Sequence, residues 1–358
     1  MDRLKLVMVG NGMAGVRTLE ELLRLAPDLY DITVFGAEPH PNYNRILLSP
    51  VLAGERTFDD IVLNGLDWYA GHGIDLRLGR KVVSIDRKRR VVLADDGSSA
   101  RYDRLILATG STPVILSIPG NRLGGVIAYH DIADTEKMLE ITRRHSHAVV
   151  IGGGLLGLEA ANALRQRGMD VTVAHLADWL LERQLGQAAS KRLQQALEAR
   201  GIRFRLGEQT EELLDHGTGR VCAVQFEGGD SIAADLVVMA TGIRPNTGLA
   251  EKAGIPCNHG IQVDDTLQTF DPRIYAVGEC VSHRGIACGL VAPLFEQARV
   301  CANHLAMLGT ARYRGTASGD NPAHFDPVGS LYRKLALEGD APLGGGLYDD
   351  IGFSAASA

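Results

Sequence analysis

The stretch VVIGGGLLGLE, residues 149–159, joins a valine-rich run to a helical pattern through a group of glycines. A second stretch of the same kind, LVMVGNGMAG, occupies residues 6–15. Each has the spacing G-x-G-x-x-G, which is weak evidence alone but gains weight between a strand pattern and a helical pattern. Both copies meet that condition, because strands are predicted at Leu4–Val9 and Ala148–Ile151 and helices at Val16–Leu25 and Leu158–Gln166.

The three glycines of each copy have different physical tasks. The first permits a tight turn, the second lets the backbone approach a pyrophosphate, and the third lets the helix pack closely on the strand. The anion then lies at the helix N-terminus, where N–H groups and the helix dipole favour negative charge. The residues concerned are Gly10, Gly12 and Gly15 in the first copy and Gly152, Gly154 and Gly157 in the second. Two nucleotide pyrophosphates are therefore predicted.

The strand after each turn ends at a residue placed to bind the ribose of an adenosine. In DITVFGAEPH this residue is Glu38, an acceptor for a pair of ribose hydroxyls. In MDVTVAHLADW it is His175, where an acid would indicate NAD and an arginine NADP. His175 fits either a ribose contact or a surface position at a strand end. Because no basic cluster stands there for a 2′-phosphate, NADH is favoured, and Arg183 is the nearest residue that would favour NADPH.

Each turn is followed further along by a strand that ends in Ala-Thr-Gly. The first, YDRLILATGSTP, ends at Gly110, and the second, ADLVVMATGIRPN, ends at Gly242. A short apolar strand, the pair Gly278-Glu279 and a helix from about Pro293 to Met307 come after the second. This order fits one nucleotide-binding domain that is interrupted by a second one and then completed, rather than two domains placed one after the other.

Composition and charge exclude several classes of protein. A length of 358 residues with 45% hydrophobic and 22% charged residues fits a globular chain of about two domains. A net charge of −6 argues against nucleic-acid binding. No apolar run approaches about 18 residues and no signal-peptide pattern opens the chain, so no membrane contact is expected and the protein is predicted to be cytoplasmic.

Five cysteines occur without a C-x-x-C pair, at Cys222, Cys257, Cys280, Cys288 and Cys301. Such a set suits reduced, mostly buried thiols better than a disulfide framework, a zinc site or an iron–sulfur site. No bound metal is therefore expected. Cys280, next to Glu279, is interpreted as a packed thiol rather than as a redox group.

The order of these motifs resembles the pyridine nucleotide–disulfide oxidoreductase superfamily over about residues 1–308. The resemblance implies an α/β fold with two Rossmann-like dinucleotide-binding domains. An FAD domain would comprise residues 1–112 and 241–308, and an NAD(P)H domain, residues 113–240, would interrupt it. Hydride would pass from NAD(P)H to FAD, with positioning contributing more than side-chain chemistry.

The same resemblance assigns roles to individual residues. The first three glycines and Glu38 would bind the adenosine diphosphate of FAD, with Thr109 and Gly110 near it. Glu279 takes the place of an aspartate that usually binds the FAD ribitol. The second three glycines would bind the NAD(P)H pyrophosphate, and Glu159 would approach the nicotinamide. Gly242, Gly278 and His175 are also predicted to bind the cofactors.

A narrower resemblance is to the flavin-containing N-terminal part of assimilatory NAD(P)H nitrite reductase large subunits. The stretches AEPHPNYNRILLSPVLAGE, HLADWLLERQLG and YAVGECVSHRG carry it. It implies that Asn44, Arg45 and Ser49 line the FAD pocket, although Arg45 also suits a solvated loop. The helix that begins near Pro293 would direct its positive end at the flavin pyrimidine and stabilise the reduced ring. The stretch NRILLSPVL has no cysteine, unlike its counterpart in disulfide reductases, so an external acceptor protein with an iron–sulfur or sirohaem centre is expected to take the electrons.

The C-terminal part departs from the family pattern. Full nitrite reductases continue into iron–sulfur and sirohaem domains, whereas residues 309–358 are interpreted as a truncated interface-like segment, which leaves the oligomeric state open. Two alternative functions remain at this point. One is a rubredoxin or ferredoxin reductase, and the other is a non-catalytic flavoprotein scaffold or redox sensor.

Overall fold

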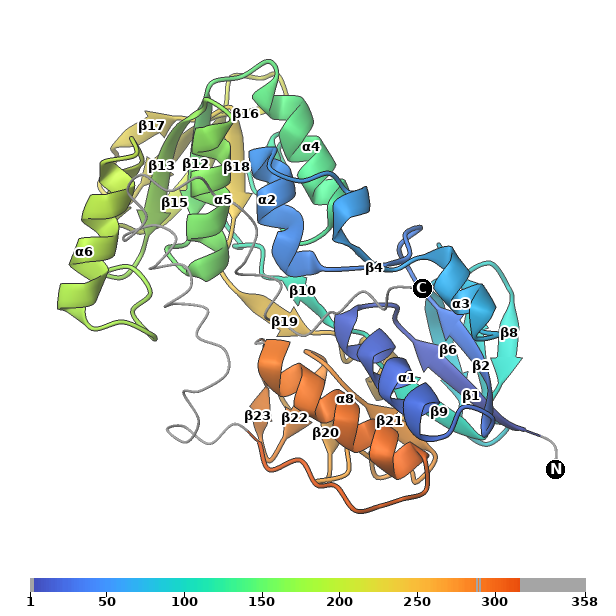
Figure 1. The fold of residues 1–358 in the computed structure, drawn as a ribbon. Helices are drawn as coiled ribbons and strands as arrows, with labels where there is room; N and C mark the ends of the chain where they lie inside the picture. Colours follow the sequence, from blue (N-terminus) through green and yellow to red (C-terminus); the bar gives the residue numbers. More distant parts are fainter. Residues whose placement is uncertain (1–2, 288, 290, 316–358) are drawn as a thin grey trace. The chain divides into compact units, whose positions relative to one another are not determined.

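The computed structural model describes residues 3–287, 289 and 291–315, which form two compact units (Figure 1). Unit 1 contains the described residues of 1–44, 62–112 and 243–324, and unit 2 contains 45–61 and 113–242. The sequence-based boundaries placed residues 45–61 with unit 1, and this differs from the structure. Of the predicted interface-like segment, residues 316–358 lie outside the described residues.

The centre of unit 1 is a five-stranded parallel sheet in the order β21-β9-β1-β2-β5. Its strands are β1 (Leu4–Val9), β2 (Tyr30–Phe35), β5 (Asp75–Arg77), β9 (Arg104–Leu107) and β21 (Ile274–Ala276). Helices α1 (Met13–Leu25) and α8 (Val291–Leu305) pack side by side (Figure 1). The middle strands are almost continuously apolar and buried, as expected for a parallel sheet covered on both faces.

Smaller elements complete unit 1. They are two three-stranded sheets, β6-β7-β8 and β20-β22-β23, and the strand pairs β3-β4 and β10-β19. Their bounds are β3 (Asn42–Tyr43), β4 (Val62–Asn64), β6 (Val82–Asp86), β7 (Val91–Ala94), β8 (Ser99–Arg101), β10 (Ser111–Pro113), β19 (Ile243–Pro245), β20 (Ile261–Val263), β22 (Val281–His283) and β23 (Ile286–Ala287), with helices α3 (Leu66–Gly71) and α7 (Gly248–Lys252).

Unit 2 repeats the parallel architecture in the order β11-β18-β12-β13-β14. The strands are β11 (Val126–Ile127), β12 (His147–Ile151), β13 (Asp170–His175), β14 (Arg203–Leu206) and β18 (Leu236–Met239). In both sheets the strand before a glycine turn is central, the next strand lies on one side, and the Ala-Thr-Gly strand lies on the other. The predicted α/β class with two such sheets is confirmed.

The other elements of unit 2 are helical or antiparallel. The antiparallel sheet has strands β15 (Thr210–Asp215), β16 (Val221–Phe226) and β17 (Ser231–Ala233), and the helices are α2 (Leu48–Ala53), α4 (Ile132–Thr142), α5 (Leu155–Gln166) and α6 (Gln187–Glu198). Short 3-10 turns at Arg45–Leu47 and Asp59–Ile61 flank α2.

Helix α2 explains why residues 45–61 belong to unit 2. It packs against α5, and Arg167, just after α5, donates through Nε to the Leu52 carbonyl (2.6 Å) and through Nη2 to the Val51 carbonyl (3.3 Å). Carbonyls at a helix C-terminus lack partners within the helix, and a guanidinium satisfies them well. This long-range contact has no local sequence signal.

The helix boundaries differ slightly from the predictions. Helices α1 and α5 begin directly after the second glycine of each turn, because the third glycine lies inside the first helical turn. Helix α8 begins two residues before Pro293. Proline is tolerated there because N–H groups in the first turn have no partner within the helix, so its missing N–H costs no hydrogen bond. No helix in the described part of the chain has the length and apolar character needed to cross a membrane.

Candidate functional site

The first glycine turn leaves no room for a side chain at Gly10. Its N–H donates to the Phe35 carbonyl (2.8 Å), and the Ala108 N–H donates to the Val9 carbonyl (2.8 Å), so three strands meet at the turn. Gly10 has φ +107°, and a Cβ there would lie 2.0 Å from the Ala108 oxygen. Only glycine fits this position.

The other two glycines of this turn have opposite surroundings. A Cβ on Gly15 would lie 2.9 Å from the Ala108 Cβ and 3.0 Å from the Met8 Sδ, so helix and strand approach closely there. A Cβ on Gly12 would meet no atom of the described residues within 4 Å beyond its chain neighbours. Gly12 is the N-cap of α1, and no side chain in the described part of the chain caps the helix. The position is therefore open on the side where a pyrophosphate is predicted.

The second turn repeats this geometry. Gly152 donates to the Ala174 carbonyl (2.8 Å), and a Cβ on it, at φ +122°, would lie 2.3 Å from the Ala240 oxygen. A Cβ on Gly157 would lie 2.1 Å from the Gly152 oxygen. One on Gly154, the N-cap of α5, would meet nothing within 4 Å among the described residues beyond its chain neighbours, and none of these residues caps the helix with its side chain. The steric tasks expected of the glycines are thus present twice.

The side chain predicted to bind the first ribose is held by a tyrosine. Tyr43 is buried, and its hydroxyl donates to Glu38 Oε2 over 2.6 Å. Asn44, next in the chain, is also buried. Tyr43 was not among the residues predicted from the sequence.

Asn11, between the first two glycines, offers a test of whether this turn fits a ligand. Its carbonyl accepts from Asn42 Nδ2 (3.0 Å), and its Oδ1 accepts from the Tyr69 hydroxyl (2.8 Å). Its Nδ2 is buried and has no hydrogen-bond partner among the described residues. A buried donor without an acceptor is costly, and a bound group with acceptor oxygens would remove that cost. The turn fits the polar adenosine diphosphate part of FAD.

His175 is not a surface residue at a strand end, which was one of the two sequence-based readings. Its side chain is only 12% exposed. Its Nδ1 accepts from the Gly153 N–H (3.1 Å), and its Nε2 lies 3.1 Å from Glu182 Oε2. The histidine therefore links the second glycine turn to an acidic side chain that the sequence did not single out. Arg183 is exposed.

Two residues predicted for different cofactors are hydrogen-bonded in unit 2. Ser49 Oγ donates to Glu159 Oε2 (3.2 Å), and the buried Tyr129 hydroxyl donates to Ser49 Oγ (3.2 Å). Arg45 donates through Nη1 to the His130 carbonyl (3.0 Å), which rules out a purely solvated loop arginine. The segment that carries Arg45 and Ser49 thus lies against α5 and the chain before α4.

The two Ala-Thr-Gly ends bind the chain segments beside them. In unit 1, Thr109 Oγ1 donates to the Asn246 carbonyl (2.8 Å), and the Asn246 N–H donates to the Gly110 carbonyl (2.9 Å). In unit 2, Thr241 Oγ1 donates to the Val114 carbonyl (2.8 Å), whose N–H donates to the Gly242 carbonyl (2.9 Å). Each Ala-Thr-Gly end therefore serves as an anchor for a neighbouring segment, a structural task that the sequence did not reveal.

The Gly278-Glu279 pair is held by two side chains that were also missed. Gln297 of α8 is buried and accepts from the Gly278 N–H (2.9 Å), and Ser111 Oγ donates to Glu279 Oε2 (2.6 Å). Gly278 has φ +90°, and a Cβ on it would lie 3.1 Å from Ala14. Ser111 of β10 thus holds the Glu279 carboxylate, which is predicted to bind the ribitol. Gln297 of α8 holds the backbone at Gly278, the preceding residue.

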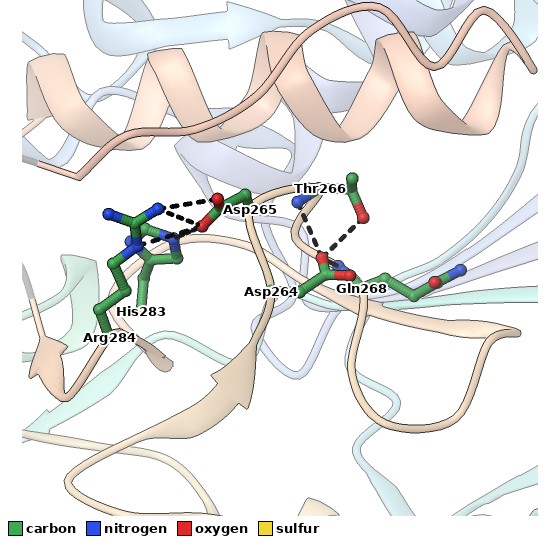
Figure 2. A network of polar contacts seen from close by, with 6 residues as sticks. All are labelled: Asp264, Asp265, Thr266, Gln268, His283 and Arg284. Atoms are coloured by element: carbon green, nitrogen blue, oxygen red, sulfur yellow. Dashed lines mark hydrogen bonds and ion pairs between the residues drawn. The ribbon is translucent and has the colours of Figure 1, made fainter.

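The strand after Glu279 is anchored by a polar network (Figure 2). Asp265 accepts from His283 Nε2 (2.8 Å) and from Arg284 Nη2 (2.8 Å), and these bonds lower the pKa of Asp265. Asp264 accepts from the Thr266 N–H (2.8 Å) and the Gln268 N–H (3.1 Å), which fixes the turn after β20. The network therefore stabilises the turn after β20 and also β22, the strand that follows Glu279 in the chain.

The described cysteines are thiols without disulfide partners. Cys280 and Cys301 are buried, and Cys222 and Cys257 are half-buried. Burial raises the pKa of Cys280, although polar groups of Thr109 and Gly110 act in the opposite direction. A thiol with a raised pKa is a poor nucleophile, so Cys280 is a packing residue. Cys288 lies outside the described residues, and the described residues hold no group of three or more potential metal ligands.

The sequence is similar to a known protein family and to known members of it. Residues 4–304 match the model of the pyridine nucleotide-disulphide oxidoreductase family. The chain is 50% identical, over 98% of its length and 46% of the relative's, to nitrite reductase [NAD(P)H] of Bacillus subtilis. It is 47% identical, over 88% of its length and 41% of the relative's, to the assimilatory nitrate reductase electron transfer subunit of the same organism.

Solved structures of related reductases have a similar fold. Putidaredoxin reductase, in its covalent complex with putidaredoxin, matches with a TM-score of 0.82 and 31% identity over 88% of this chain and 78% of that one. A ferredoxin reductase from Rhodopseudomonas palustris matches with a TM-score of 0.82 and 30% identity over 87% of this chain and 78% of that one. The chain spans less than half the length of the two Bacillus subtilis relatives.

Proposed function

The chain belongs to the pyridine nucleotide-disulphide oxidoreductase family, and from this premise we propose that it transfers hydride from NAD(P)H to FAD and passes the electrons to a separate acceptor protein. Bound FAD would supply a ring that takes up two electrons with a hydride and gives them up one at a time. The single observation that supports this function best is the duplicated glycine turn, with one open N-cap, Gly12 or Gly154, in each unit.

We assign FAD to unit 1 and NAD(P)H to unit 2. Unit 1 offers Glu38, the buried Asn11 donor without a partner and the fixed Glu279 carboxylate. Unit 2 offers Gly154 at its open turn and Glu159, which we assign to the nicotinamide end. The domain ranges predicted from the sequence are kept in this proposal, except that residues 45–61 pack with unit 2.

The protein's own side chains would act mainly by positioning. Ser49 and Tyr129 orient the Glu159 carboxylate, and Ser111 orients Glu279. Holding reacting partners in a productive geometry lowers a barrier by several kcal/mol without acid–base chemistry. No cysteine is needed in this scheme, in line with the absence of one from the stretch NRILLSPVL.

We propose nitrite reduction in nitrate assimilation as the setting and an iron–sulfur or sirohaem protein or domain as the acceptor. The names of the two Bacillus subtilis relatives support this setting, and the five cysteines of this chain lack the paired spacing of a cluster site. A ferredoxin or rubredoxin as acceptor is the second candidate, because a ferredoxin reductase shares the fold at 30% identity.

The proposal is tested with the 358-residue chain purified in the presence of FAD. We expect a yellow protein whose flavin absorbance bleaches on anaerobic addition of NADH and which then reduces ferricyanide. Nitrite should not be consumed until a partner with metal centres is added, and a ferredoxin should be tried in parallel. A colourless protein whose melting temperature does not rise with FAD would refute the proposal. A flavin that NADH and NADPH both fail to reduce would instead support the scaffold alternative.

A further inference from the structure

The segment after β13 folds back onto the second glycine turn. The Gly153 N–H donates to His175 Nδ1, so this nitrogen carries no proton. The ring proton then lies on Nε2, which donates to Glu182 Oε2 over 3.1 Å. In this arrangement the imidazole is neutral, and both of its nitrogens are engaged.

The backbone fixes the same segment. The Leu181 N–H donates to the Gly153 carbonyl (3.1 Å), and the side chains of Leu180 and Leu181 are buried. A Cβ on Gly153 would lie 2.8 Å from the His175 ring, so the imidazole packs directly on the turn. Glu182 is therefore held at a defined place beside the end of β13.

The charge at the end of β13 affects which dinucleotide can bind there. The end of the strand that follows a glycine turn is where the adenosine ribose is bound, and a 2′-phosphate there requires positive charge. His175, neutral and engaged on both sides, offers none. The charge bound to it is the Glu182 carboxylate, whose side chain is 35% exposed and can act on a ligand. Arg183, next in the chain and exposed, acts in the opposite sense.

We propose that Glu182, held in position by His175, makes the nucleotide site of unit 2 select NADH over NADPH. The inference rests on the proposed function and adds the identity of the donor. Glu182 determines specificity by repelling a 2′-phosphate, and His175 is a positioning residue.

The test compares the FAD-loaded chain with Glu182→Gln and with Asp178→Asn. The control variant removes the same charge from an exposed residue of the same segment that lies beside Gly207 rather than His175. Dissociation constants of NAD⁺ and NADP⁺ are measured by calorimetry, and kcat/KM is measured for both reduced forms with ferricyanide. We expect the wild type to prefer NAD⁺, and Glu182→Gln to reduce this preference about tenfold, chiefly through tighter NADP⁺ binding.

Asp178→Asn should leave the preference unchanged, and Arg183→Gln should increase it. His175→Ala should lower the preference, and adding Glu182→Gln to it should have little further effect, because the carboxylate has then lost its anchor. An unchanged preference in Glu182→Gln, an equal change in Asp178→Asn, or a wild type that prefers NADP⁺ would overturn the inference. Binding of neither nucleotide would refute the proposed function itself, and the inference with it.

Discussion

Ser49 donates a hydrogen bond of 3.2 Å to Glu159, although the two residues are 110 positions apart and were assigned to different cofactors. Ser49 lies in α2 and Glu159 in α5, and Arg167 ties these helices together. The pair joins a residue expected near the flavin to one expected near the nicotinamide. Under the proposed function, we expect removal of this hydrogen bond to affect hydride transfer and to leave the fold intact.

We therefore expect Ser49→Ala to slow flavin reduction about 3- to 10-fold, because one hydrogen bond that positions a carboxylate contributes roughly 1 kcal/mol. Stopped-flow absorbance after mixing with NADH measures the rate. Ser190→Ala is the matched control, since it removes another buried serine hydroxyl of unit 2 that has no partner among the described residues. Equal rates for wild type and Ser49→Ala would contradict the assignment of Glu159.

A second prediction concerns FAD affinity in unit 1. Tyr43→Phe removes the hydroxyl that donates to Glu38, so the carboxylate proposed to bind the ribose loses this hydrogen bond. We expect FAD to bind about 3- to 10-fold more weakly, as measured by flavin fluorescence during titration of the apoprotein. Tyr30→Phe removes a similar buried hydroxyl that donates to the Leu305 carbonyl, away from the turn, and should leave FAD affinity unchanged. A similar loss in both variants would point to general destabilisation instead.

The glycine turns were predictable from the sequence because their requirements are local. Gly10 and Gly152 each lie directly after a strand, and their spacing to the following glycines is set by one helical turn. The strand Leu4–Val9 was predicted with its observed bounds for the same reason. Apolar runs buried on both faces leave little choice of structure.

The supporting contacts could not be predicted, because most of them join distant positions and the others depend on how a loop folds. Gln297 supports Gly278 from α8, and Ser111 supports Glu279 from a strand 168 residues earlier. Glu182 is close to His175 in the sequence, but their contact needs a left-handed backbone at Leu181 (φ +52°), which leucine rarely adopts. Pattern analysis assigns residue types to positions, whereas these roles arise from tertiary packing.

A third prediction uses the unusual carboxyl group of Asp134 in α4. Burial, and then the charge of Asp131, raise the pKa of Asp134 to about 6. A raised carboxyl pKa means that the folded state favours the protonated form. The resulting destabilisation is absent below the unfolded pKa of about 4, grows as pH rises, and is complete above about pH 6.

Asp134→Asn should therefore raise the free energy of unfolding by about 1–2 kcal/mol at pH 7.5 and leave it nearly unchanged at pH 4. The amide oxygen can still accept from the His130 N–H. Asp235→Asn is the opposite control. Burial acts to raise the pKa of Asp235, but the His147 and Ser146 N–H groups outweigh it and lower that pKa, so this variant should lose stability at pH 7.5 and less at pH 4. Urea unfolding at both pH values measures the difference, and a gain for Asp134→Asn that is equal at both would rule out titration as its cause.

The last prediction separates the two turns. A Cβ at Gly12 or Gly154 would meet no atom of the described residues within 4 Å beyond its chain neighbours, and both residues have extended backbone that valine adopts readily. Gly154→Val should therefore fold normally, retain FAD and lose NADH oxidation, because the valine is expected to collide with the predicted pyrophosphate. Gly12→Val should lose FAD and still bind NAD⁺, as flavin content and calorimetry would report. Gly157→Val, whose Cβ would lie 2.1 Å from the Gly152 oxygen, should instead lower the melting temperature. If Gly154→Val lost its flavin and Gly12→Val retained it, the cofactor assignment of the two units would have to be exchanged.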